Sequence, residues 1–190
     1  MELLRNRGET KNVSGDYLKS LDNKKTSSAV RVQKISAKSD LRKAFAIRIR
    51  VFVKEQGVPE EIELDRDDKR AIHFLATSAG RAVGTARIVM RQETAKIGRM
   101  AVLKSHRRKG VGMKLLRRAV AMAKKLGARK IYLHAQVPVI GFYETFGFHC
   151  VGPVFYEAGI PHRKMILEKG INRKECEGRK SKGDQPVGPT

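Results

Sequence analysis

A short basic segment with two glycines is the part of the sequence whose residue types and spacing most clearly indicate chemistry. It runs from Arg107 to Gly112 as R-x-x-G-x-G and leads into residues 111–126, where apolar side chains recur at helical spacing. The first N–H groups of a helix lack backbone partners, and each cation beside them opposes the helix dipole by about 0.3–1 kcal/mol. Each glycine in the first turn costs about 1 kcal/mol more than alanine. An anion bound at this helix start would explain both features.

The spacing of the glycines does not match two common phosphate-binding motifs. The chain contains neither the G-x-x-x-x-G-K-[ST] phosphate loop nor the G-x-G-x-x-G dinucleotide fingerprint. The plainer alternative is a basic helix start with two flexible glycines, and six residues alone do not decide between them.

The elements around this segment must position it. Residues 95–102 fit a strand, Gly127 suits the left-handed cap of the helix that follows, and residues 130–136 read as a buried strand. A strand, a helix and a second strand with this spacing form a crossover unit, which predicts that the two strands are parallel.

The remaining elements complete one mixed sheet. Ser39 or Asp40 is expected to cap a helix that ends near Gly57, and residues 78–81 are expected to join two strands as a hairpin. The other predicted elements are the strands 30–35, 72–77, 82–90, 148–151 and 164–167, and a short helix that starts at Pro138 and stops at Gly147. The order β-α-β-β-β-α-β-α-β-β predicts a single α/β (or α+β) domain with a mixed central sheet flanked by helices.

Length and composition set the outer limits. The chain has 190 residues, 41% of them hydrophobic, which suits one domain with a sizeable core. We expect a loosely ordered polar extension over residues 1–29, the domain over 30–169, and a polar disordered tail over 170–190. No apolar run suits a membrane span or a secretory signal. With only two cysteines and no metal-ligand spacing, we expect a cytoplasmic protein without a metal.

Charge is unevenly distributed along the chain. The net charge is +22, and residues 104–130 hold eleven Lys and Arg with no Asp or Glu. This basic stretch could be a solvated face, a nucleic-acid surface or a site for a phosphate-rich cofactor. By contrast, acidic residues crowd the run from Glu60 to Asp68. That run is either a solvated turn or an acidic wall that attracts a cationic amine.

Several separate segments of the chain have distinctive motifs. In order along the chain they are IRIRVFVKEQGVP, ELDRDD, AIHFLA, VGTARI, IGRMAV, RRKGVG, HAQ, GFYETFGF and FYEAGIPHRKM. Together they resemble one family, the YjcF/ElaA-like branch of the GNAT superfamily of acetyl-CoA-dependent N-acetyltransferases. The resemblance covers about residues 30–169. It implies a GNAT-like domain, with acetyl-CoA as cosubstrate and a cofactor gap between the parallel strands 95–102 and 130–136.

The resemblance also implies roles for particular residues. Backbone groups of Met100, Ala101 and Val102 would pair with the pantetheine arm of coenzyme A, and Tyr143 would lie near the cofactor sulfur and protonate the leaving thiolate. The loop around the diphosphate would consist of Arg107, Arg108, Lys109, Gly110, Val111 and Gly112. The family usually has Asn before the Ala-Gln pair, and this chain has His134 there instead. By itself, Tyr143 also fits a core aromatic between Phe142 and Phe146.

Transfer of an acetyl group to an amine needs a deprotonated amine and a protonated leaving group, but no covalent intermediate. The candidates for the base are Glu55, His73, His134, Glu157 and His162. We predict Glu55 and His162 for this role. The loop position of His162 equally fits a structural hydrogen-bonding histidine.

Two other functions compete with an N-acetyltransferase acting on a small molecule or peptide. One is a basic nucleic-acid-associated protein, against which stands the lack of an RNA-binding aromatic signature or a helix-turn-helix. The other is an acyl-CoA-binding regulator on the same fold. We expect no membrane partner, and a homodimer is one option for the assembly.

Overall fold

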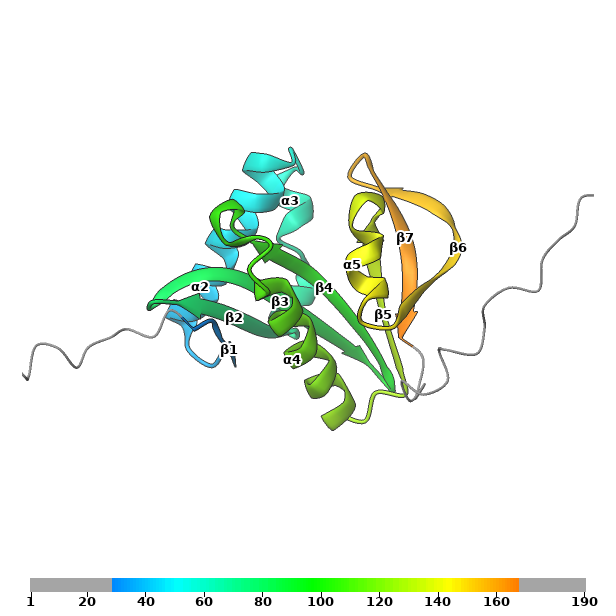
Figure 1. The fold of residues 1–190 in the computed structure, drawn as a ribbon, viewed down its shortest axis with the longest axis horizontal. Coiled ribbons are helices and arrows are strands. Elements are labelled where there is room, and N and C mark those ends of the chain that lie inside the picture. Colours follow the sequence, from blue (N-terminus) through cyan, green and yellow to red (C-terminus); the bar gives the residue numbers. More distant parts are fainter. Residues whose placement is uncertain (1–28, 168–190) are drawn as a thin grey trace, which may run out of the picture.

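A seven-stranded mixed sheet forms the centre of the computed structural model, which describes residues 29–167 (Figure 1). Its strand order is β1-β2-β3-β4-β5-β7-β6. The strands are β1 Arg31–Lys34, β2 Ile72–Ser78, β3 Arg81–Arg91, β4 Thr94–Val102, β5 Lys130–Gln136, β6 Phe148–Glu157 and β7 Ile160–Leu167. The helices are α2 Lys38–Arg48, α3 Glu60–Glu63, α4 Val111–Lys125 and α5 Ile140–Glu144. The predicted N-terminal extension and C-terminal tail lie almost wholly outside the described residues.

Helices cover both faces of the sheet. The apolar stripe of α4, with Val111, Leu115 and Ala119 almost fully buried, packs against the same core as Ile88 and Ile97 of the sheet. On the opposite face, α2 buries Ala44 and Ile47 against Leu75 and Ala101. The prediction of one mixed sheet flanked by helices is confirmed. Among the helices of residues 29–167, none is both long and apolar enough to cross a membrane.

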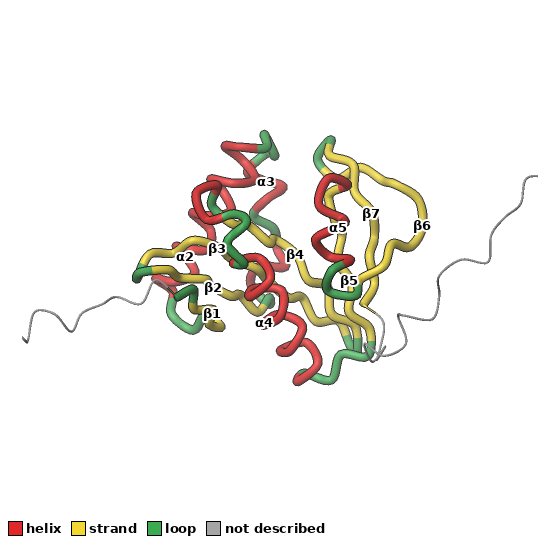
Figure 2. Tube along the Cα trace, viewed as in Figure 1, coloured by secondary structure: helices red, strands yellow, loops and turns green. Residues whose placement is uncertain are grey.

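The crossover unit around α4 has the predicted geometry. Gly127, with φ of +81°, follows the end of α4. The chain then enters β5, which pairs with β4 in parallel. This pairing covers only four positions, from Thr94↔Lys130 to Ile97↔Leu133. Beyond it the two strands diverge, as Figure 2 shows.

A β-bulge explains why the pairing between β4 and β5 stops. The register of β4 against β3 shifts between the pairs Arg87↔Gly98 and Thr85↔Ala101. Within that shift Arg99 has φ of +50°, a left-handed conformation that is uncommon for a residue with a side chain. A bulge bends its strand and increases its twist, so the end of β4 turns away from β5.

Two predictions of local structure are wrong. The first helix is capped by Ala37 without a side-chain hydrogen bond, and Asp40 lies in the first turn, where it accepts a hydrogen bond from Lys43 (2.8 Å). Ser39 and Asp40 are therefore helical residues and not caps. The helix does end near Gly57, but its last part, Ile49–Glu55, has π-helical spacing.

The second wrong prediction concerns residues 152–163, which we expected to separate two short strands. They instead extend β6 and β7 into a long hairpin that turns at Ala158 and Gly159, both with positive φ. Gly152 and Pro153 lie where the register shifts between Val151 and Phe155, so an irregularity absorbs them without ending the strand.

Candidate active site

A cleft of about 990 Å³ occupies the region where β4 and β5 diverge. It reaches from the start of α4 to the acidic run before β2 and the β6–β7 hairpin. Most of the predicted site residues line it, namely Met100, Ala101, Val102, Arg107, Arg108, Gly110, Gly112, Tyr143 and His162. Lys109, Val111 and Glu55 are not among its lining residues. The fold thus brings side chains from distant parts of the sequence into one cavity.

The glycine loop forms the start of α4 at one end of this cleft. Gly110 is the N-cap in a left-handed conformation (φ +74°), no side chain caps the helix, and its first turn holds no acidic residue. The first helical bond runs from the Lys114 N–H to the Gly110 carbonyl (3.1 Å), which leaves the preceding N–H groups for a ligand. Arg108 is also left-handed (φ +60°). The loop combines unpaired donors with exposed cations, which is the chemistry of an anion site.

Gly112 has a packing role beside its place in the loop. A Cβ atom built at this position would lie 3.3 Å from Cζ of Phe142, on α5 next to Tyr143. Any side chain here would therefore press on the helix that carries the tyrosine. The glycine loop and α5 are in direct contact.

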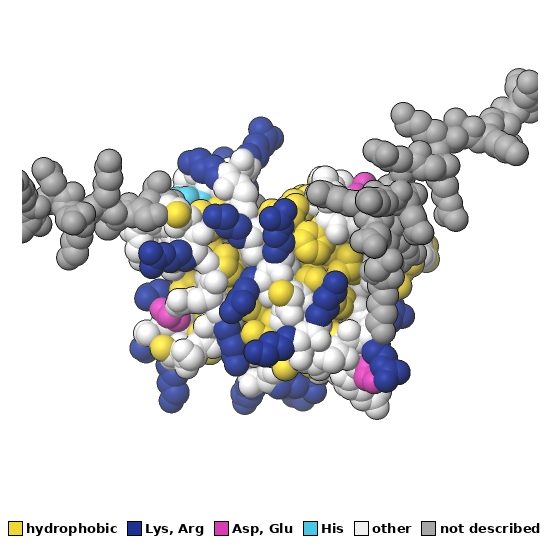
Figure 3. All heavy atoms as spheres, turned by 60° about the horizontal axis from the view of Figure 1, so that its bottom comes forward, with side chains coloured by type: hydrophobic (Ala, Val, Ile, Leu, Met, Phe, Trp, Pro, Cys, Tyr) yellow, Lys and Arg dark blue, Asp and Glu magenta, His cyan; other side chains and the backbone are white. Residues whose placement is uncertain are grey.

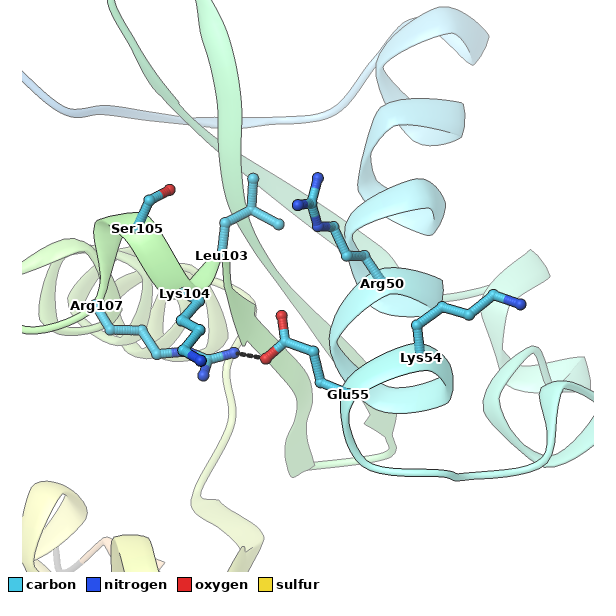
Figure 4. Close-up of a pocket in the computed structure, with 7 residues that line it drawn as sticks. All are labelled: Arg50, Lys54, Glu55, Leu103, Lys104, Ser105 and Arg107. Atoms are coloured by element: carbon cyan, nitrogen blue, oxygen red, sulfur yellow. Dashed lines mark hydrogen bonds and ion pairs between the residues drawn. The ribbon is translucent and has the colours of Figure 1, made fainter.

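Arg107 and Glu55 pair with each other at the edge of a second cleft. The Arg107 guanidinium donates to the Val102 carbonyl (2.9 Å) and to the Glu55 carboxylate (2.5 Å). Glu55 lines this neighbouring basic cleft of about 800 Å³, together with Arg50, Lys54 and Lys104 (Figure 4). The geometry thus places Glu55 as a partner of the loop arginine, outside the cleft that contains Tyr143.

Tyr143 stands between the core and the cleft. Its side chain contacts the rings of Phe142 and Phe148, and its hydroxyl donates to the Met100 sulfur at 3.8 Å. Burial raises the pKa of this phenol to about 12, so the hydroxyl stays protonated at neutral pH. Tyr143 therefore combines the core packing that its neighbours indicate with a hydroxyl on the cleft wall.

His162, on β7, also lines the cleft and is buried. Its Nδ1 atom is 2.8 Å from the Ile160 carbonyl oxygen. Because a carbonyl only accepts, Nδ1 carries the proton and Nε2 holds the lone pair of the neutral ring. His162 is thus both a structural hydrogen bonder and a ring with one basic nitrogen.

A second histidine on this wall is paired with a carboxylate. Nδ1 of His134 is 2.6 Å from Oε1 of Glu157, and both residues line the cleft. The hydrogen bond from His134 lowers the pKa of Glu157. The sequence prediction of Glu55 and His162 as the base does not include this pair. Its two residues are 23 positions apart and meet only through the long β6–β7 hairpin.

Part of the acidic run forms the opposite wall, where Glu63 and Asp65 line the cleft. Glu60 and Glu61 at the start of the run are exposed, whereas the later carboxylates are paired with arginines. The Arg48 side chain, 0% exposed, donates to Glu63 (2.6 Å) and to both carboxylate oxygens of Asp68 (2.7 and 3.0 Å). Arg87 forms a two-pronged pair with Asp65 and also reaches Asp68 at 2.6 Å.

The bulge residue Arg99 completes this network. It donates to the Glu63 carbonyl (3.1 Å), to the Ile62 carbonyl (2.9 Å) and to Asp65 (2.9 Å). Three arginines thus face three carboxylates. The solvated-turn prediction is wrong for Glu63, which is 2% exposed, whereas Glu60 and Glu61 are exposed as that prediction expects. The arginines balance the charge that the acidic-wall alternative assigned to Glu63, Asp65 and Asp68.

Comparisons with known proteins agree with this architecture. Residues 19–169 match the family model described as an acetyltransferase (GNAT) domain. The chain is 39% identical to the N-acetyltransferase YjcF of Bacillus subtilis over 132 residues, which are 67% of this chain and 92% of that protein. The chain therefore belongs to the GNAT acetyltransferase family.

A solved structure narrows the assignment of the chain within this family. The crystal structure of Escherichia coli ElaA matches with a TM-score of 0.67 and 29% identity, covering 74% of this chain and all of that one. Together with the similarity to YjcF, this assigns the chain to the YjcF/ElaA-like branch, as the motifs predicted. A GNAT acetyltransferase from Elizabethkingia anophelis, solved with acetyl-CoA bound, shares the fold alone (TM-score 0.59, 16% identity, 73% of this chain and 97% of that one).

Proposed function

We propose that this protein transfers the acetyl group of acetyl-CoA to an amine of a small molecule or peptide. One observation carries the proposal. A single cleft holds, at one end, an uncapped helix start among cations and, further along, the Tyr143 hydroxyl, which contacts the Met100 side chain. Coenzyme A has a matching shape, with phosphates at one end and a thioester at the other. The Elizabethkingia relative with bound acetyl-CoA supports the same ligand.

The proposed binding follows the cleft. The N–H groups at the start of α4, with Arg107, Arg108 and Lys109 around them, hold the diphosphate. Beyond Ile97, β4 has β3 on one side and the opening towards β5 on the other. Backbone groups of Met100 and Ala101 hold the pantetheine arm there, while the Val102 carbonyl is already bound by Arg107.

The chemistry is a direct transfer. The lone pair of the neutral amine forms the C–N bond at the thioester carbonyl, and the C–S bond breaks. The sulfur takes a proton from the Tyr143 hydroxyl, which solvent then restores, and the nitrogen loses one proton to a base or to water. Burial keeps Tyr143 protonated until charge develops on sulfur. With only two cysteines in the chain, we expect this reaction in the reducing cytoplasm.

The first test is binding followed by turnover. Acetyl-CoA should raise the melting temperature, and dephospho-CoA should raise it less if basic residues also hold the 3′-phosphate. Gly112→Val should weaken this binding because its side chain crowds the loop against Phe142. Release of thiol should then be measured with polyamines, aminoglycosides, amino acids and peptides as acceptors.

The outcomes separate the competing functions. Binding with turnover supports the transferase. Binding without turnover across the acceptor classes would favour an acyl-CoA-binding regulator. The basic face over α4 (Figure 3), to which Lys114, Arg117, Arg118, Lys124 and Lys125 contribute exposed side chains, is the surface that a nucleic-acid-binding protein would use. No thermal shift at millimolar acetyl-CoA would contradict the proposal.

A further inference from the structure

We infer that His134, oriented by Glu157, is the base that accepts the proton of the acceptor amine. The inference rests on the proposed function and deepens it. It assigns a catalytic residue that the family motif does not supply, because the chain has histidine where the resemblance leads to asparagine.

The fold places this pair at the opening between the strands. His134 comes directly after Leu133, the last residue of β5 that pairs with β4. Glu157 is the last residue of β6, which is separated from β5 by the strand β7. Both side chains are partly exposed, His134 by 21% and Glu157 by 41%, and both line the cleft that contains Tyr143. The pair is therefore accessible to a substrate in that cleft.

The hydrogen bond sets the tautomer of the ring. A carboxylate accepts but does not donate, so the 2.6 Å contact places the proton of neutral His134 on Nδ1. Nε2 then holds the lone pair. When Nε2 gains a proton, the adjacent carboxylate stabilises the imidazolium, which is how a carboxylate assists a histidine base.

Aromatic rings fix the orientation of His134. The Phe155 ring meets it edge-on at 4.8 Å between ring centroids, and the Tyr132 ring lies at 5.8 Å. A base held by a carboxylate and two rings needs little reorganisation before it accepts a proton. By comparison, Nδ1 of His162 is bound to a neutral backbone carbonyl, and Glu55 is paired with Arg107 outside this cleft.

Other charged groups also face the pair. Lys164 of β7 is the register partner of His134, and its ammonium lies over the Tyr132 ring at 5.0 Å. Lys96 of β4 lines the same cleft and interacts with Glu157, as does His162. Burial lowers the pKa of Lys96. Glu157 is therefore a carboxylate that interacts with several basic groups around His134.

The proton balance is complete with these groups. An acceptor that arrives as an ammonium loses one proton to solvent and becomes the neutral amine. As its nitrogen bonds to the thioester carbonyl, the second proton passes to Nε2 of His134, and the sulfur takes the Tyr143 proton when the C–S bond breaks. Solvent removes the proton from His134 and returns one to Tyr143.

The test compares His134→Asn with Glu157→Gln. The Asn amide can still donate to Glu157 but cannot act as a base, so kcat/KM for the acceptor should fall about 10²-fold or more. The activity that remains should lose the acidic limb of the wild-type pH profile. Glu157→Gln should lower kcat/KM about tenfold and move that limb to lower pH, because a neutral amide no longer stabilises the imidazolium. The affinity for acetyl-CoA should be unchanged in both variants.

His149→Asn, at an exposed site on β6 away from the cleft, is the matched control and should have the wild-type profile. The inference is overturned if His134→Asn keeps wild-type kcat/KM, or if His162→Asn alone removes the acidic limb. Should His134→Asn fail to fold, an unshifted acidic limb in Glu157→Gln would overturn it equally. These failures leave the transferase in place, whereas a wild-type protein without turnover would remove both proposals.

Discussion

The two walls of the cleft use similar charged residues in different ways. On one wall Arg48, Arg87 and Arg99 bind Glu63, Asp65 and Asp68 so completely that few donors or acceptors remain for a ligand. On the other, one hydrogen bond joins His134 to Glu157, and both side chains are partly exposed. Each charged side chain of the arginine–carboxylate wall forms several hydrogen bonds and is fixed. The His134–Glu157 pair shares one hydrogen bond, so its groups remain able to exchange protons.

The fixed wall also has a mechanical effect on the other. Arg99 is the bulge residue that turns β4 away from β5, and its guanidinium is anchored to the acidic run. A left-handed conformation at a residue with a side chain costs about 1–3 kcal/mol and persists only where its surroundings hold it. We conclude that the arginine–carboxylate wall stabilises the opening on which the site depends.

The largest expected effect comes from breaking the fixed wall. Arg48→Ala would remove the buried partner that Glu63 and Asp68 share, leaving Glu63 with Arg99 and Asp68 with Arg87. We expect a loss of about 3–5 kcal/mol in the free energy of unfolding. Urea unfolding measures it. Arg50→Ala, two residues further on at an exposed position, should change the value by about 0.5 kcal/mol or less. His134→Asn on the other wall should also be mild, so equal losses in Arg48→Ala and His134→Asn would contradict the distinction between the walls.

The second effect concerns the chemistry between the walls. Tyr143→Phe removes only the hydroxyl, so packing against Phe142 and Phe148 should survive. If the hydroxyl protonates sulfur only as the C–S bond breaks, kcat should fall by about tenfold to a thousandfold, with the affinity for acetyl-CoA nearly unchanged. The measurement is steady-state kinetics on an acceptor from the screen, with direct titration of acetyl-CoA. A variant with wild-type kcat would make Tyr143 a core aromatic alone.

The parts of the molecule that depend on local pattern were predictable. The helical stripe of residues 111–126 and the spacing of the flanking strands gave the parallel pair, and R-x-x-G-x-G located the uncapped helix start. Both follow from periodicity and backbone conformation within about 40 residues.

The parts that depend on distant partners were not predictable in the same way. Taken alone, the acidic run predicts a solvated turn. The fold changes this by bringing Arg48, Arg87 and Arg99 to it from up to 37 residues away. The bulge at Arg99 exists only against β3. Glycine and proline at positions 152 and 153 suggested a loop, although pairing with β7 holds the segment in a strand.

The smallest expected effect is the pH dependence of the fixed wall. Burial raises the pKa of Asp65, but hydrogen bonds and charge from Arg87 and Arg99 outweigh it and lower the pKa to about 2. Since this folded value lies below the usual value of 3.8, the unfolded chain binds a proton first. The contribution of Asp65 to stability is therefore complete above about pH 5 and is lost as the pH falls towards 2.

Between these limits the wild type should lose about 2 kcal/mol more stability than Asp65→Asn. Urea unfolding across this range measures the difference, and Glu144→Gln, which changes an exposed carboxylate on α5, should run parallel to the wild type. Parallel curves for Asp65→Asn and the wild type would show that Asp65 is no better bound than a surface carboxylate, and the two walls would then differ less than their contacts indicate.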